Sequence, residues 1–141
     1  MFKKLLAAAL FLSLSGCSDK LTLDALSGTY EGKFHYLTPE NLTKVTADAK
    51  ITFSEQSYSS EGNTNYIPAG GSGDFEIEAD KILNFNDKNV WTANFDWLLI
   101  LNGKFKYDVK GDSLILTRYS EPCASCSMQA GSYQYRLKRT N

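Results

Sequence analysis

The stretch Val45-Thr46-Ala47-Asp48-Ala49-Lys50-Ile51-Thr52-Phe53 decides the fold class of this chain. Its apolar residues occupy the odd positions and its polar residues the even ones. That is the period of a half-buried β-strand, because successive side chains point to opposite faces of a sheet. The same alternation occurs in residues 30–36 and in residues 74–80. These three segments are therefore predicted to be strands with one buried and one solvated face.

Six further segments have the composition of short strands, which makes nine candidates, of which one or two are expected to merge or fail. The six are residues 56–61, 81–86, 95–101, 104–109, 113–119 and 132–138. Turn-forming stretches separate several neighbours and are short enough for hairpins. They are Ala79-Asp80-Lys81, Asn102-Gly103 and Lys110-Gly111-Asp112.

No segment has the pattern of a long helix, so parallel strands would lack the crossovers that they need. The predicted fold class is all-β: an antiparallel up-and-down meander closed into a small barrel of about eight strands. Closure removes the exposed edges that an open sheet must protect. Residues 97–101 are apolar at both parities, so this strand is expected to be covered on both faces.

Two loops are longer than such a meander requires. Residues 62–73 are rich in Gly, Asn and Ser but carry Tyr66 and Ile67 just before Pro68. This loop is interpreted either as a lid over the barrel mouth or as a surface loop in which Tyr66 packs locally. The second loop, residues 120–131, contains Cys123 and Cys126.

The N-terminal stretch Leu14-Ser15-Gly16-Cys17 ends an apolar run that follows Lys3 and Lys4, and it resembles the lipobox of bacterial lipoprotein precursors. The resemblance implies that Cys17 is acylated, with palmitate among the chains, and becomes the first mature residue. The expected organisation is a signal peptide at 1–16, the lipidated cysteine and a tether at 17–27, and the barrel domain at 28–141. The implied location is the bacterial cell envelope, and Ser18 favours the outer membrane.

Composition limits the partners that the mature chain can have. Removing residues 1–16 leaves 125 of the 141 residues, the size of one domain. The loss of two lysines reduces the 15 basic residues to 13 against 16 acidic ones, a net charge of −3, which argues against nucleic acid. The N-terminal apolar run is too short to span a bilayer and no further run reaches that length, so the lipid is the expected membrane attachment.

The start of the predicted barrel, Leu26-Ser27-Gly28-Thr29-Tyr30, resembles the opening Gly-x-Trp motif of lipocalins, with Tyr30 in place of the tryptophan. Residues 91–97, 102–103 and 111–117 are similar to small lipocalin-like bacterial lipoproteins. In lipocalins a basic residue of the last strand packs across that tryptophan. Arg136 is the expected counterpart here, with Lys138 or Arg139 as the alternatives.

The lipocalin resemblance implies a barrel that either fills itself with side chains or holds one small molecule. The first functional hypothesis is that the protein binds a small hydrophobic or amphipathic ligand. Aromatic residues at strand parity, together with Tyr66, are the candidate lining residues, although the same side chains could fill the interior. The candidates are Phe34, Tyr36, Phe53, Tyr66, Phe75, Phe105, Tyr107 and Tyr133.

The alternative hypothesis is an envelope protein–protein interaction module, or an inhibitor, that acts through loops 62–73 and 120–131. An enzyme is not expected, because no acid, base and nucleophile converge and His35, the single histidine, has outward parity. The row of acidic residues within 74–80 is interpreted as a solvated strand face instead of a calcium site. No cofactor is predicted.

The pair Cys123 and Cys126 has intrinsic chemistry. Exported proteins mature in an oxidising compartment, so a disulfide that closes a tight loop is the primary interpretation. The less favoured alternative is a Cu(I) site in which the reduced thiols act with Met128, because soft sulfur ligands select that ion.

Overall fold

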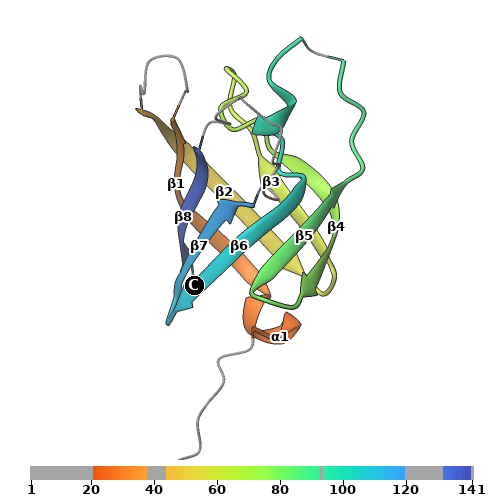
Figure 1. The fold of residues 1–141 in the computed structure, drawn as a ribbon, viewed down its shortest axis with the longest axis vertical. Coiled ribbons are helices and arrows are strands. Elements are labelled where there is room, and N and C mark those ends of the chain that lie inside the picture. The colour runs from red at the N-terminus through yellow and green to blue at the C-terminus, as the bar shows by residue number, and fades with distance from the viewer. Residues whose placement is uncertain (1–20, 38–43, 93, 120–131, 141) are drawn as a thin grey trace, which may run out of the picture.

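The computed structural model describes residues 21–37, 44–92, 94–119 and 132–140. These residues form one closed antiparallel barrel of eight strands, each paired with the next in sequence, with β8 paired back to β1 (Figure 1). The predicted fold class is confirmed. The elements are α1 Leu23–Leu26, β1 Gly28–Leu37, β2 Lys44–Ser54, β3 Ser57–Glu61, β4 Gly71–Glu78, β5 Ile82–Asp87, the 3₁₀ helix η1 Trp97–Leu99, β6 Gly103–Lys110, β7 Ser113–Arg118 and β8 Ser132–Thr140.

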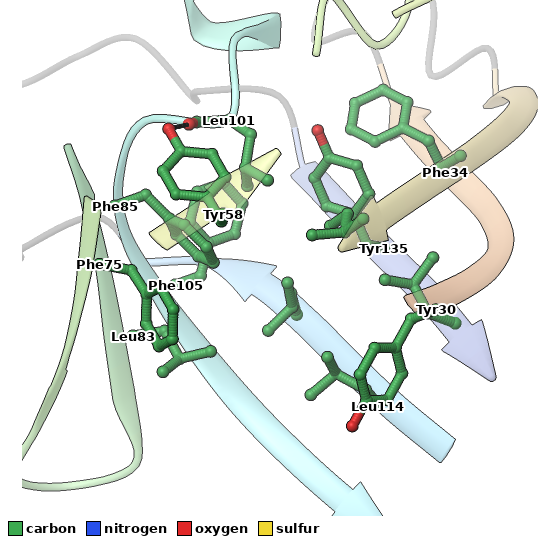
Figure 2. Packing of buried hydrophobic residues seen from close by; sticks show 14 of the residues in the cluster. Tyr30, Phe34, Tyr58, Phe75, Leu83, Phe85, Leu101, Phe105, Leu114 and Tyr135 are labelled. Carbon is green, nitrogen blue, oxygen red and sulfur yellow. Dashed lines mark hydrogen bonds between the residues drawn. The ribbon is translucent and has the colours of Figure 1, made fainter. Parts of the chain in front are cut away.

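The barrel interior is built from the apolar parity of each strand, and aromatic rings dominate it. Six rings from six different strands are each 2% exposed or less: Phe34, Phe53, Phe75, Phe85, Phe105 and Tyr135. Figure 2 shows most of these rings converging from the surrounding strands. Burial of such large side chains supplies most of the hydrophobic stabilisation of the fold.

Rings from non-adjacent strands meet inside the barrel. The ring centroid of Phe53 on β2 lies 5.2 Å from that of Phe75 on β4 and 6.2 Å from that of Phe85 on β5. On the other side, Tyr135 on β8 lies 6.1 Å from Phe105 on β6. Because these distances are those of direct aromatic contact, side chains fill the interior at this level.

The two ends of the barrel differ. At one end, the α1 end, the connections are the tight turns at residues 55–56, 79–81 and 111–112, and α1 packs beside them (Figure 1). At the other end, the loop end, lie the long connections, of which residues 62–70 and most of 88–102 are described.

One predicted strand is wrong. Within residues 95–101 the chain forms η1, so the hairpin predicted at Asn102-Gly103 is also wrong and the nine candidates reduce to eight. The carboxylate of Asp96 caps η1 by accepting a hydrogen bond from the Leu98 N–H at 2.9 Å, which turns the backbone away from an extended path. Trp97 and Leu98 are exposed, so the predicted covering of both faces is wrong as well.

The loop predicted at residues 62–73 is shorter than expected, because β4 already begins at Gly71. Gly71 has φ 150°, and a Cβ there would lie 2.9 Å from an Asp87 carboxylate oxygen and 3.3 Å from the Leu101 carbonyl oxygen. At Gly73 a Cβ would lie 2.0 Å from the Asn86 carbonyl oxygen. The glycines that resemble a loop in sequence therefore permit close packing of β4 against its neighbours.

The interval assigned to the tether contains α1, a single helical turn. Thr22 caps it, with the hydroxyl oxygen accepting a hydrogen bond from the Ala25 N–H at 3.2 Å. Leu26 is fully buried in the core. Residues 21–27, which belong to the predicted tether, thus pack against the barrel.

Candidate functional site

The predicted lining residues fall into three groups. Six are buried at 7% exposure or less: Phe34, Phe53, Phe75, Phe105, Tyr107 and Tyr133. Tyr36 is half-buried and stacks on Tyr133 with a centroid distance of 5.0 Å. Tyr66 lies apart from the interior, on the loop 62–70. A ligand placed among the interior rings would have to displace contacts that those rings make with one another.

The α1 end of the barrel is closed by Tyr30 and Arg139. The guanidinium carbon of Arg139 lies 5.1 Å from the centre of the Tyr30 ring, and Nη2 donates hydrogen bonds to the Tyr30 hydroxyl at 2.5 Å and to the Ala25 carbonyl. The cation–π contact expected from lipocalins is therefore present, with Arg139, one of the two alternatives, as its cation.

The expectation that Arg136 plays this role is wrong. Tyr133, Tyr135, Leu137 and Arg139 share the inward parity of β8, whereas Arg136 has the outward one and donates to Gln134 Oε1 at 2.6 Å. The backbone register pairs Tyr30 directly with Arg139. The parity of β8 was the signal in the sequence that could have selected Arg139.

A groove of about 580 Å³ lies at the α1 end, between α1 and the β6–β7 hairpin, and Tyr107 is the one predicted lining residue that it reaches. Its surface mixes apolar side chains with two lysines and an aspartate. It is lined by Leu21, Ala25, Lys81, Tyr107, Asp108, Val109, Lys110 and Gly111. This mixture of opposite charges provides no concentrated polar site for a small molecule.

At the loop end, Asn63 organises residues 62–70. Its side-chain oxygen accepts hydrogen bonds from the N–H groups of Asn65 and Ile67, both at 3.0 Å, and its carbonyl accepts one from Tyr66 N–H at 3.0 Å. This arrangement holds Tyr66 at φ 56°, the left-handed region that a bulky residue seldom adopts. The Tyr66 ring is thereby presented at the surface, 42% exposed.

The loop 62–70 is joined to the segment before β6. Gly70 and Ile100 form a parallel bridge, in which Leu101 N–H donates to Gly70 O at 2.8 Å and Ala69 N–H donates to Leu99 O at 3.0 Å. From inside the barrel, the Tyr58 hydroxyl donates to the Leu101 carbonyl at 2.6 Å (Figure 2). The two loops therefore form one ordered unit fixed to the core.

Two polar side chains of the barrel wall hold η1. The second carboxylate oxygen of Asp96 accepts a hydrogen bond from the Tyr133 hydroxyl at 3.0 Å. Arg118 Nη2 donates to the carbonyls of Leu98 at 2.9 Å and Ile100 at 3.0 Å. Burial, together with the bond to Asp96, raises the pKa of Tyr133, and burial lowers the pKa of Arg118. Both ends of η1 are thus tied to β7 and β8.

Exposed apolar side chains gather on these loops. Five large ones occur among the described residues, and four of them belong to the loop end: Val90 at 90%, Trp97 at 59%, Leu98 at 47% and Tyr66 at 42% exposure. The Tyr66 ring stacks on Phe95 at 4.8 Å and 8°. We call Tyr66, Val90, Phe95, Trp97 and Leu98 the loop-end patch. Among these residues the sequence hypotheses named only Tyr66 as a site residue, because they assigned 95–101 to a strand.

Other predicted features lie outside the described residues: Cys17, Cys123, Cys126, Met128 and the loop 120–131. Acylation, the disulfide and the copper alternative stay predictions. Within the part of the chain that the structure describes, no three His, Cys, Asp or Glu residues are grouped so that they could hold a metal ion. The helices described there are too short to cross a membrane. No family model, curated protein or solved structure matches the chain.

Proposed function

We propose that this protein is a lipid-anchored envelope lipoprotein that uses a lipocalin-like barrel as a rigid support and binds a partner protein with its loop end. The observation that carries the proposal is the loop-end patch at the end of the barrel opposite α1, in which four exposed aromatic and aliphatic side chains accompany the half-buried Phe95. Patches of this kind on a folded monomer commonly mark interaction sites.

The position of the proposed anchor orients the patch. Cys17 precedes Leu21 by four residues, which extend over about 14 Å at most. A ten-residue strand such as β1 extends about 33 Å, or about 25 Å along the axis of a tilted barrel. With the lipid in a membrane next to α1, the patch therefore faces away from that membrane and toward the aqueous side.

The chemistry of the loop end favours a protein partner. Half of residues 62–70 and 88–102 are Tyr, Trp, Asn, Thr or Gly. Of these, Tyr and Trp supply rigid contact area, and Asn and Gly supply adaptable hydrogen bonds in binding loops. Trp and Tyr are also the residues most enriched among binding hot spots. This supports the interaction hypothesis over the small-ligand hypothesis, since the interior rings already contact one another.

The proposal is tested by extracting the full-length protein from its own membranes in mild detergent and measuring the size of the complex. We expect the wild type to migrate as a complex larger than a monomer and the double variant Tyr66→Ser, Trp97→Ser to migrate as a monomer. Val109→Ser is the matched control, because Val109 is exposed but lies at the α1 end. A monomeric wild type, or a complex that survives the double substitution, would contradict the proposal.

A further inference from the structure

We infer that Trp97 and Leu98 on η1 are the part of the loop-end patch that enters the partner, and that the partner protein receives them in an uncharged, apolar pocket. The inference rests on the proposed function and makes it more specific. It follows from the rigidity of η1, from the charge of the loops and from the position of the anchor.

The backbone of η1 is fixed while its side chains are exposed. Four side-chain hydrogen bonds from Asp96, Tyr133 and Arg118 hold it, and Leu99 next to the exposed pair is buried in the core. An exposed apolar pair on a fixed backbone loses little conformational freedom when it binds. This combination distinguishes Trp97 and Leu98 from Val90, for which the structure gives no side-chain contact with the barrel.

The two loop-end segments that the structure describes have few charges to offer a charged partner. Residues 62–70 contain no Asp, Glu, Lys or Arg, and residues 88–102 contain only Lys88 and Asp96. Lys88 pairs with Asp74, and both carboxylate oxygens of Asp96 accept hydrogen bonds within the protein. A partner that presented uncompensated charge here would lose hydration without gaining an ion pair. The surface that complements these two described segments is therefore uncharged.

Two other candidate binding partners, a second copy of this chain and a neutral sugar polymer, fit the loop-end patch less well than an apolar protein pocket. A second copy on the same membrane would also have its patch facing away from that membrane, so the two patches could not meet face to face. A neutral sugar polymer would suit the aromatic rings but not the aliphatic side chains Leu98 and Val90, which offer no hydrogen bonds to hydroxyl groups. An apolar protein pocket accommodates both kinds of side chain.

The test uses a photoreactive phenylalanine analogue placed singly at positions 90 and 98 of the full-length protein in its native cells, with position 109 as the control site. We expect one protein adduct from positions 90 and 98 and none from 109. Trp97→Ala should lower the yield of the adduct from position 90 by about 30-fold, the effect of a binding hot spot. Between about 0.05 M and 0.5 M salt the yield should change less than about twofold, because no ion pair is screened.

The outcomes separate the inference from the proposed function. An adduct from position 90 that persists in Trp97→Ala, or that disappears at high salt, overturns the inference but leaves loop-end docking intact. An adduct that a muramidase releases, or that extracts as lipid, shows a glycan or a membrane as the occupant and overturns both. No adduct from either loop-end position also overturns both. Arg118→Gln should reduce the adduct from position 98 while circular dichroism shows an intact barrel, since the Arg118 guanidinium binds the η1 carbonyls of Leu98 and Ile100.

Discussion

Arg139 shows how a single residue can join three elements at the α1 end of the barrel. Its guanidinium covers the Tyr30 ring and binds the carbonyl of Ala25, so it joins β8 to β1 and to α1. The parity of β8 predicts this role from sequence once Tyr133 and Tyr135 are assigned inward. The resemblance to lipocalins favours Arg136, which lies between Tyr135 and Leu137, and that choice puts the cation on the outward parity.

Arg139→Gln should lower the free energy of unfolding by about 1–3 kcal/mol, because it removes a cation–π contact and a charged hydrogen bond. Arg136→Gln is the matched control on the same strand, and its effect should stay within about 0.5 kcal/mol because Arg136 is exposed. Urea unfolding of the two purified variants measures both values. Equal destabilisation by the two substitutions would show that Arg139 has no special role.

Three buried tyrosines should make the protein sensitive to alkaline pH. Burial raises the pKa values of Tyr58, Tyr133 and Tyr135, with Asp87 adding to the effect at Tyr58 and Asp96 at Tyr133. Above about pH 10 the unfolded chain releases tyrosine protons that the folded chain retains, so stability falls as pH rises, with a limiting slope of about 1.4 kcal/mol per pH unit for each tyrosine. Below that pH the contribution is fully present.

Urea unfolding at a series of pH values from neutral to strongly alkaline tests this expectation. Tyr58→Phe should flatten the decline above pH 10, because one of the three buried hydroxyl groups is gone. A free energy of unfolding that stays constant through this range would mean that these hydroxyl groups titrate in the folded protein as they do in water.

At the scale of elements, β2 and η1 mark what a sequence pattern can and cannot predict. The alternation in 45–53 predicts β2 because period and propensity agree with tertiary packing. Residues 97–101 do not alternate, because every residue in this run is apolar, so the sequence period does not predict their structure. The carboxylate of Asp96, which accepts a hydrogen bond from Leu98 N–H, determines the path of the backbone here. Which apolar residues of η1 are exposed depends on contacts with Tyr133 and Arg118, which no local pattern contains.

Removing the cap should loosen η1 without affecting the barrel. Asp96→Ala takes away the bonds to Leu98 N–H and to the Tyr133 hydroxyl, and a lost cap costs about 1 kcal/mol. Hydrogen exchange of residues 97–101 should therefore accelerate by about fivefold or more. Asp112→Ala, in the exposed β6–β7 turn, is the control and should leave that exchange unchanged. Unaltered exchange in Asp96→Ala would show that the cap does not hold η1.

At the scale of the whole molecule, the sequence predicts the closed barrel but not how the side chains inside it contact one another. Alternation identifies Phe53 and Phe75 as inward-facing, but only the three-dimensional arrangement shows that their rings touch across non-adjacent strands. Whether a barrel encloses a ligand space or fills itself is therefore a property of the closed fold. The loop end could not be predicted in detail for the same reason, because two loops distant in sequence stabilise each other there.

Cys17→Ala should release the protein from membranes without unfolding it, because the proposed anchor lies outside the described barrel. Fractionation of cells, with circular dichroism of the released protein, measures both effects. Cys123→Ser is the control and should remain with the membranes. Recovery of Cys17→Ala only in the membrane fraction would contradict the lipobox interpretation.

The central claim is that binding occurs on the loop end and not inside the barrel, and hydrogen exchange tests it most directly. The membrane-extracted complex and the free protein should be compared peptide by peptide. The account predicts that amides in residues 62–70 and 88–102 become protected in the complex, with unchanged exchange in β4 to β6 and at α1. Protection that appears instead in the interior strands, or at the α1 end, would contradict it.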